Sequence, residues 1–451
     1  MRWAQFIHIY QPPTQKEIIV RRITDECYRK IFSKLLEIPR AKLTVNISGV
    51  LCELLDAYGG SDVLKMMKTL LERGAIEITG SAKYHAFLPF LPDDEIERQI
   101  RLNEETLKKY FGSAWKKSGF FPPEMAYSAR VAQVVRTMGY EWIIADELGF
   151  PKNVEHRFDT MYEIREVPGL KIFFRDRSLS LALTSARTDD PKKSIRNILE
   201  KFPLDSCVVS AMDGEIFGHH RPGLEKVFFD IFKTEHIDSL KMSDLLSKYE
   251  RHELISPVDS TWATAEKDLI AGEPYHRWCG NDNPIQKMQW QLTDLAIAVT
   301  HRQSVDSKER GLLDRALHSD QYWWASARPW WSLEMIERGA YEFKSIVSGS
   351  SAARAEEKSE AEELYKSIVF TGFEWQRKGI VDRLSREEDE EVREFLAEKE
   401  NTVLTKSEYA EMIRNWKIEM GEAADNGEYY RAGMLKDRIR ELSEEMEKAK
   451  D

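Results

Sequence analysis

The chain has 451 residues, of which 42% are hydrophobic, and its formal net charge is −11. This length exceeds what one ordinary core holds, so we expect a large unit with helical additions. The acidic balance disfavours a large nucleic-acid surface.

Short apolar strands alternate with amphipathic helices about seven times in the first half of the chain. Each strand ends in a polar loop, which is typical of a parallel barrel or an open parallel sheet. A charged helix is expected over residues 16–37, after the first strand. The strands are expected at residues 3–10, 43–47, 75–79, 119–121, 141–145, 160–163, 171–175 and 206–211.

The pattern changes beyond about residue 238, where the strand signal stops and many tryptophans gather. Core packing is at least as good an explanation for most of these tryptophans as stacking on a ligand. From residue 348 Glu, Lys and Arg dominate, and residues 412–422 and 428–448 predict an antiparallel helical hairpin with a turn at 425–427. Before it, helices are expected at residues 242–251, 284–301, 307–324 and 332–347.

Two acidic residues follow predicted strands, at positions where catalytic residues are often found in parallel α/β folds. Asp213 comes directly after the apolar strand 206–211, and Glu124 follows strand 119–121 in a loop stiffened by Pro122 and Pro123. In parallel α/β folds, functional residues lie where strands end. We therefore expect Glu124 and Asp213 to face each other across one pocket.

Five stretches of the chain are similar to the five motifs of glycoside hydrolase family 57, in the family's order over about residues 3–345. The resemblance implies an α/β fold with an incomplete parallel (β/α)7 barrel, followed by a helical region. It also implies retaining chemistry on α-glucans such as starch or glycogen, by hydrolysis or by transfer, without a metal or cofactor. The five stretches are residues 8–12, 77–89, 119–127, 213–220 and 319–324.

Carried onto this sequence, the resemblance makes Glu124 the nucleophile and Asp213 the acid/base. Retaining cleavage places two such carboxyl groups about 5–5.5 Å apart, and a raised pKa on the acid keeps it protonated. One departure is Tyr10, which stands where the first motif usually has a histidine. The expected substrate contacts are His8, Gln11, Glu77, His85, Glu215, His219, Trp262, Asp320 and Trp324.

Some of these residues have a second interpretation. Glu215 lies two residues beyond Asp213, so it is an alternative candidate for the acid, or a residue that orients Asp213 or His219. The stretch Arg175–Asp176–Arg177 is expected to form structural ion pairs at the barrel mouth. Core packing is slightly favoured over sugar stacking for Trp262 and Trp324.

Two other classes of protein compete with this interpretation. In a metal-dependent polysaccharide deacetylase, Asp213, His219 and His220 would be metal ligands. In a non-catalytic glucan-binding protein the barrel would be degenerate. The presence of both Glu124 and Asp213 argues against that class. Bound metal would identify the deacetylase.

The C-terminal residues 419–442 resemble the UVR helical motif of excision-repair proteins, which pairs one protein with another. The implied role is contact with a protein partner or self-association. The expected domains are a barrel over 1–238, a helical domain packed on it over 239–347, a charged linker with helices over 348–405, and the UVR-like hairpin over 406–451.

The remaining features concern location. The N-terminus lacks the apolar core and cleavage site of a signal peptide. No stretch approaches the roughly 18 apolar residues that a membrane span needs. The 4 cysteines are far apart, lack zinc-ligand spacing and fit a reducing compartment. We expect a cytoplasmic protein.

Overall fold

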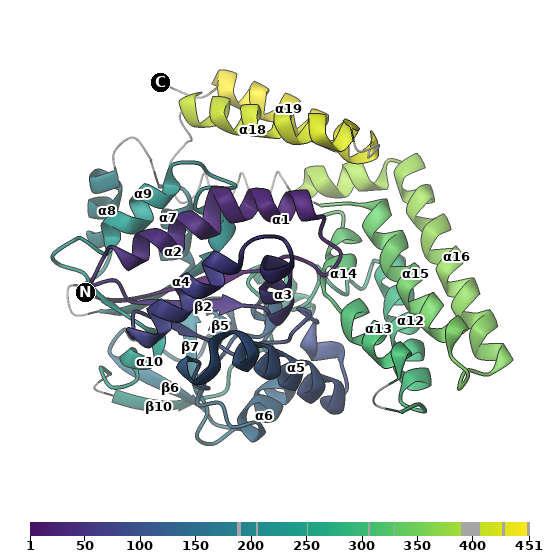
Figure 1. Ribbon diagram of the computed structural model, residues 1–451, viewed down its shortest axis with the longest axis horizontal. Helices are drawn as coiled ribbons and strands as arrows, with labels where there is room; N and C mark the ends of the chain where they lie inside the picture. Colours follow the sequence, from purple (N-terminus) through teal and green to yellow (C-terminus); the bar gives the residue numbers. More distant parts are fainter. Residues whose placement is uncertain are drawn as a thin grey trace.

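In the computed structural model (Figure 1), strands and helices alternate up to about residue 255, and the described elements beyond it are helices. The structure describes all residues except 187–190, 204–205, 250, 305–306, 329, 389–405, 426–428 and 449–451.

Seven parallel strands of the described chain form the predicted incomplete barrel, in the order β8-β1-β2-β3 and then β4-β5-β7. A bridge between Gly80 and Phe120 joins the two sheets at β3 and β4. On the other side no ladder pairs β7 with β8 in the described residues, so the barrel stays open there. These strands are β1 (Arg2–Ile9), β2 (Leu43–Ile47), β3 (Ile76–Ile78), β4 (Gly119–Phe120), β5 (Trp142–Asp146), β7 (Lys171–Arg175) and β8 (Cys207–Asp213).

Three further strands extend the two sheets. β6 (Thr160–Ile164) runs antiparallel to β7, and β10 (Arg251–Ile255) pairs with β6 as an edge strand. β9 (Asp238–Leu240) pairs with the start of β1. The expectation of helices alone beyond residue 238 is therefore wrong. Four of the five residues of β10 are exposed, so this edge strand carries little of the apolar pattern by which strands are recognised.

Helices cover the outside of the barrel and bury the apolar face of its strands. The predicted helix 16–37 is one continuous helix with a wider π turn in its middle. The covering elements are α1 (Glu17–Ile23), η1 (Thr24–Tyr28), α2 (Arg29–Leu36), α3 (Gly49–Ala57), α4 (Ser61–Glu72), α5 (Asp93–Phe111), α6 (Ala129–Thr137), α7 (Arg177–Thr184), α8 (Pro191–Leu199), α9 (Leu224–Ile231) and α10 (Met242–Leu245).

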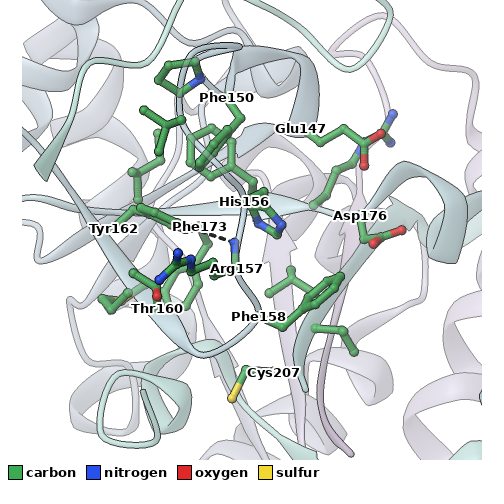
Figure 2. A pocket seen from close by; sticks show the side chains of 18 of the residues that line it. Glu147, Phe150, His156, Arg157, Phe158, Thr160, Tyr162, Phe173, Asp176 and Cys207 are labelled. Carbon is green, nitrogen blue, oxygen red and sulfur yellow. Dashed lines mark hydrogen bonds between the residues drawn. The ribbon is translucent and has the colours of Figure 1, made fainter. Parts of the chain in front are cut away.

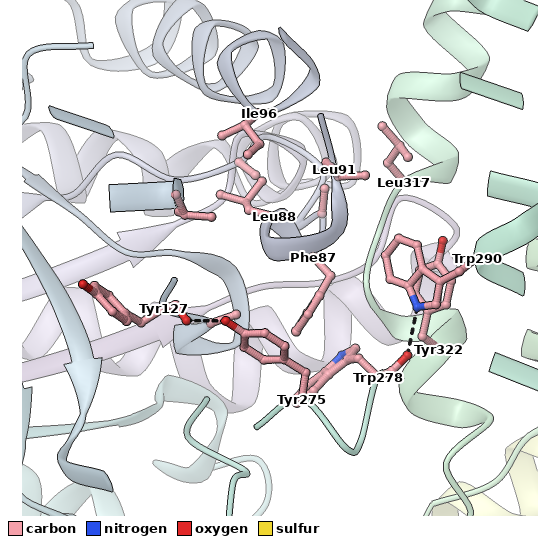
Figure 3. Close-up of a cluster of buried hydrophobic side chains, with 14 of the residues drawn as sticks. Phe87, Leu88, Leu91, Ile96, Tyr127, Tyr275, Trp278, Trp290, Leu317 and Tyr322 are labelled. Carbon is pink, nitrogen blue, oxygen red and sulfur yellow. Dashed lines mark hydrogen bonds between the residues drawn. The ribbon is translucent and has the colours of Figure 1, made fainter. Parts of the chain in front are cut away.

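The helical region packs on the barrel through a cluster of aromatic side chains (Figure 3). The Phe87 ring stacks on Trp278 at 5.0 Å between centroids, and Trp290 stacks on Tyr322 at 4.0 Å. The Trp290 indole N–H donates to the Trp278 carbonyl over 3.0 Å. Trp278 and Trp290 are therefore part of the hydrophobic core. The region contains α11 (Glu266–Ile270), α12 (Pro284–Thr300), α13 (Lys308–Ala316), α14 (Asp320–Trp324), α15 (Leu333–Gly349) and α16 (Ala355–Arg377).

The predicted hairpin is formed by α18 (Lys406–Asp425) and α19 (Tyr429–Lys448), drawn in yellow in Figure 1. The two helices bury a small core of their own. Part of the turn expected at 425–427 lies outside the described residues. None of the helices that the structure describes is both long and apolar enough to cross a membrane. The core residues of the hairpin are Tyr409, Ile413, Ile439 and Leu442.

Replacing Gly119 with alanine is expected to destabilise the fold by about 1–3 kcal/mol, because overpacking a filled core forces its neighbours to shift. A Cβ atom there would lie 2.0 Å from Cε2 of the Trp142 ring, which is fully buried. Urea unfolding would measure the change. Gly311→Ala in α13 is the matched control: its Cβ meets nothing within 4 Å, and alanine favours a helix by roughly 0.5–1 kcal/mol. An unchanged midpoint for Gly119→Ala would contradict this prediction.

Candidate active site

The structure brings Glu124 and Asp213 into one buried site. Asp213 ends β8, where it lies opposite His8 of β1. Glu124 lies in the short helical turn η4 (Pro123–Met125) that follows β4. The negative charge of Asp213 contributes to the raised pKa of Glu124, so the two carboxyl groups interact. The expectation that two strand ends deliver these acids to one site is consistent with this geometry.

The backbone at Glu124 has an unusual conformation. Its φ is 61° and ψ is 15°, and the next residue, Met125, has a φ of 52°. Left-handed conformations cost non-glycine residues about 1–3 kcal/mol each and gather at functional sites. The backbone N–H of Trp262 donates to the Glu124 carbonyl over 3.3 Å and helps to hold this turn. The turn fixes the direction of the Glu124 side chain.

Both carboxylate oxygens of Glu124 accept a hydrogen bond. The Ser319 hydroxyl donates to Oε1 over 2.9 Å, and the Trp262 indole N–H donates to Oε2 over 3.0 Å. His85 Nδ1 lies 3.0 Å from the same Ser319 hydroxyl and 3.6 Å from Glu124 Oε1. Trp262 and His85 are thus placed where substrate contacts were expected. Ser319 was not singled out, because a serine just before a helix reads as an N-cap.

A stack of aromatic rings lies beside this carboxylate. Tyr10 stacks on His85 with 4.0 Å between ring centroids, and His8 stacks on His85 at 4.9 Å. His8 is 3% exposed, and its Nδ1 lies 2.8 Å from Asn46 Oδ1. Burial lowers the pKa of His8 to about 4, so its ring is neutral near pH 7. His8 therefore packs against His85 as a neutral, buried ring.

Tyr10 and His318 both bind Asp320 of α14. The Tyr10 hydroxyl donates to Asp320 Oδ2 over 2.6 Å, and His318 Nδ1 lies 3.0 Å from the same oxygen. Burial opposes the charge of Asp320, but the hydrogen bond from His318 and electrostatic interactions with His318 and His85 hold its pKa below the usual value. Asp320 is therefore ionised near neutral pH, and Tyr10, which departs from the family motif, is one of the two residues that hold it.

The two acids have raised pKa values. Burial raises the pKa of Glu124 to about 8, with a further contribution from the charge of Asp320, against hydrogen bonds from Ser319 and Trp262. Burial raises the pKa of Asp213 to about 6, and the charge of Arg175 opposes that shift. The carboxylate of Asp213 receives no hydrogen bond from the residues that the structure describes. The two acids thus differ: Glu124 is held by donors and Asp213 is not.

The π turn η1 binds the loop that follows Asp213. Three consecutive residues reach that loop: Glu26 Oε2 lies 2.6 Å from His219 Nδ1, the Cys27 thiol lies 3.1 Å from the Gly214 carbonyl, and the Tyr28 hydroxyl donates to Glu215 Oε1. A π turn is wider than an α turn and is frequent at functional sites. The backbone N–H of Tyr10 also donates to Glu215 Oε1, over 3.2 Å. Gln11 donates to the Tyr28 hydroxyl over 3.4 Å. Glu215, His219 and Gln11 thus fix the loop, and no described contact ties them to Glu124.

Two expected substrate residues lie elsewhere. Glu77 accepts hydrogen bonds from Thr44 over 2.8 Å and from the Ser243 backbone over 3.0 Å, two residues below the level of Asp213 in the strand register. Trp324 packs edge-on against Trp330 at 6.1 Å. Glu77 is the middle residue of β3 and bonds to β2 and α10, so it lies below the rim where a substrate contact was expected.

Arg175 and Arg177 form the expected ion pairs at the barrel mouth. Both bind Asp146 of β5, over 2.6 Å and 2.7 Å. The Arg175 guanidinium also lies 5.8 Å from the centroid of the Trp262 ring. These arginines hold the loop of Trp262 by donating to its carbonyl.

The deacetylase hypothesis required Asp213, His219 and His220 to converge as ligands. Within the described ranges no group of three His, Cys, Asp or Glu residues is placed to hold a metal ion. His219 binds Glu26 instead.

Comparison with known proteins agrees with this geometry. Residues 5–270 match the model of the family described as glycosyl hydrolase family 57. The chain is 25% identical over 280 residues to an alpha-amylase of Pyrococcus horikoshii, covering 59% of this chain and 43% of the relative. It is also 25% identical over 290 residues to a 4-alpha-glucanotransferase of Thermococcus litoralis, covering 59% and 41%. The chain thus spans less than half the length of these relatives.

Solved structures share the fold. The 4-alpha-glucanotransferase of Thermococcus litoralis superposes with a TM-score of 0.60 at 19% identity, covering 77% of this chain and 58% of that one. A family 57 branching enzyme from Pyrococcus horikoshii gives a TM-score of 0.61 at 16% identity, covering 82% and 96%. Since the family model matches more than half of the residues, this chain belongs to glycosyl hydrolase family 57.

Proposed function

We propose that this chain is a retaining enzyme that acts on α-glucans by double displacement. The observation that carries the proposal is a pair of buried, interacting carboxyl groups at two strand ends, of which one is held by donors. Members of the same family named alpha-amylase and 4-alpha-glucanotransferase support the substrate class. Because the chain is shorter than those relatives, its own substrate range has to be measured.

In this proposal Glu124 attacks the anomeric carbon while Asp213 donates its proton to the leaving oxygen. Asp213 then takes a proton from water or from a sugar hydroxyl, whose oxygen bonds to the anomeric carbon as the glycosyl–Glu124 bond breaks. A nucleophile gains from fixed orientation, and the donors Ser319 and Trp262 provide it. An acid needs its proton free for the substrate, and no described donor or acceptor holds Asp213.

Substrate contacts are proposed for the residues around Glu124. His85, Trp262 and Asp320 lie in its immediate network, and Tyr10 joins them through Asp320. An aromatic stack suits the apolar face of a sugar, and an ionised Asp320 suits its hydroxyls. The other expected contacts are not proposed to touch the substrate. His8 packs in the ring stack, and Gln11, Glu215 and His219 hold the loop after Asp213.

Product analysis tests the proposal. The full chain would be incubated with maltoheptaose and with soluble starch, and products would be separated by chain length. Shorter chains alone indicate hydrolysis, and both shorter and longer chains indicate transfer. NMR of the first products should show the α anomer, since two displacements retain configuration. Initial release of the β anomer, or no change in either glucan, would overturn the proposal.

The pH profile of kcat/KM is expected to be bell-shaped, with limbs near the pKa values of about 6 for Asp213 and about 8 for Glu124. Asp320→Asn removes a negative charge that raises the pKa of Glu124, so the alkaline limb should move to lower pH. Asp294→Asn is the control, because Asp294 is not among the charges that act on Glu124. An alkaline limb that stays in place in Asp320→Asn would contradict the prediction.

For the hairpin α18–α19 we propose contact with a protein partner or with a second copy of the chain. The support is its UVR-like sequence and its small core, where Trp416, Met420 and Met446 are only partly buried. Light scattering of the chain with and without residues 406–451 tests self-association. A cytoplasmic location is also a proposal, supported by free cysteines at all four positions.

A further inference from the structure

A second cavity lies where the barrel is open, between β7 and β8 (Figure 2). Its volume is about 320 Å³, within the range of about 300–1,000 Å³ for small-molecule sites. Its walls come from the segment 147–158 after β5, from β6 and β7, from the start of β8, and from Tyr249. Glu124, Asp213, Asp320 and Trp262 are not among the lining residues. The cavity is therefore distinct from the candidate active site.

Aromatic rings form much of the wall. Phe150 packs edge-on against Tyr162 at 4.9 Å, Phe174 at 5.2 Å and His156 at 5.0 Å between centroids. Phe158 packs edge-on against His156 at 5.3 Å. In Figure 2 the His156 ring lies between Tyr162 and the carboxylate of Asp176, and Phe158 lies below it. Aromatic rings and the carboxylates of Glu147 and Asp176 thus share the wall of the cavity.

Three polar groups on the wall have no hydrogen-bond partner among the described residues. They are Oε1 of Glu147, the ring nitrogens of His156 and the hydroxyl of Tyr249. The other oxygen of Glu147, Oε2, accepts from the Arg177 backbone N–H over 2.6 Å, which holds the side chain in place. The cavity therefore offers at least one acceptor, one hydroxyl and one imidazole to a bound molecule.

The cations of the wall already form ion pairs. Lys152 pairs with Glu266 at 3.6 Å, Arg157 with Glu155 at 2.8 Å, and Arg175 with Asp146 at 2.6 Å. An anionic ligand would find no unpaired cation among these residues. A purely apolar ligand would leave the Glu147 oxygen buried without a partner, which is costly. A neutral molecule with both apolar faces and hydroxyl groups, such as a pyranose ring, fits the aromatic wall and these polar groups.

We propose that this cavity is a second saccharide site, which holds a glucosyl unit of an α-glucan away from the bond that reacts. The identity of the sugar rests on the proposed function, while the site itself rests on the cavity. The Arg175 side chain lines the cavity and also reaches the Trp262 carbonyl over 3.0 Å, so it separates the two sites. A chain held at both places would bind more tightly than one held at the acids alone.

Calorimetry with maltotriose tests this site in the full chain carrying Glu124→Gln, which prevents turnover. Two molecules per chain are expected. Adding His156→Ala and Tyr249→Phe together should weaken the second site at least tenfold, leaving one molecule per chain. These changes carry little risk to folding, because the His156 side chain is exposed and the Tyr249 hydroxyl binds no described residue. Phe370→Ala, at an aromatic side chain 67% exposed on α16, is the matched control and should keep two.

The outcomes separate this inference from the proposed function. One molecule per chain before the cavity is changed, or two molecules after it is changed, would overturn the saccharide site. Turnover of a short aryl α-maltoside by the His156→Ala/Tyr249→Phe variant should match wild type, because the acids are intact. If no glucan is converted but the cavity still binds maltotriose, the proposed function falls and the site stands.

Discussion

Replacing Glu124 with glutamine is expected to lower kcat on maltoheptaose by at least about 10³-fold, because an amide cannot attack the anomeric carbon. The two oxygens of Glu124 accept from Ser319 and Trp262, and glutamine keeps the shape but loses the nucleophile. Initial rates from reducing-end assays measure the change. Glu104→Gln is the matched control: Glu104 is also a buried glutamate, 7% exposed, and its partners are Tyr140 and Lys117. Its kcat should stay near wild type.

Azide distinguishes a lost nucleophile from a lost acid. With Glu124→Ala, azide can enter from the side of the missing carboxylate, form the C–N bond and release the leaving group, which takes a proton from Asp213. The product from an α-linked substrate is then a β-glycosyl azide. With Asp213→Ala, Glu124 forms the glycosyl-enzyme first, so azide gives the α product. An α-azide from the Glu124 variant would show that the roles are reversed.

This distinction matters because the pKa values and the hydrogen bonds point in different directions. The pKa of Glu124 is about 8 and that of Asp213 about 6, so near pH 7 the proton resides mainly on Glu124. About a tenth of Glu124 is then ionised and about a tenth of Asp213 protonated, so roughly 1% of the enzyme has the reactive arrangement. The donors around Glu124 and their absence at Asp213 favour the assigned roles. A bell-shaped profile fits both orders, and the azide products decide between them.

The sequence predicted the barrel, and it indicated Glu124 and Asp213 as candidates, because strand ends and motif residues are local features. Glu124 and Asp213 each follow an apolar strand, and parallel strands bring their ends to one rim. Ser319 and Asp320 come from the helical region, and their arrival beside Glu124 depends on how that region packs, which periodicity does not report. Asp320 was reached through the family resemblance, whereas Ser319 was missed.

Two features could not be read from the residues at all. The π turn η1 lies inside a helix with a continuous apolar stripe, and one additional residue in a turn leaves no clear mark in that pattern. Glu77 follows the family motif, yet the depth of a strand residue in a barrel depends on the strand register, which places it beside Thr44. The fold class was thus predictable, while the depth of each side chain was not.

Replacing Asp213 with asparagine is expected to lower kcat on maltoheptaose by roughly 10²–10⁴-fold, the usual contribution of general acid–base catalysis. The sugar leaving group of maltoheptaose needs a proton, whereas fluoride leaves without one. The first step with α-maltosyl fluoride should therefore lose much less than the first step with maltoheptaose. Asp294→Asn is the control, and its kcat on both substrates should stay near wild type. Asp146 is not used as the control because it binds both Arg175 and Arg177.

The comparison of the two substrates makes the test specific. If Asp213 only stabilised the barrel mouth, its loss would slow fluoride and maltoheptaose equally. If Asp213 is the acid, the ratio of the two rates should change by at least about tenfold. The alkaline limb of the pH profile should also disappear, because above the Glu124 pKa of about 8 the wild-type rate falls only through loss of the proton on Asp213. An unchanged ratio together with an unchanged alkaline limb would remove Asp213 from the chemistry and leave Glu215, whose pKa burial raises to about 8, as the next carboxyl group to test.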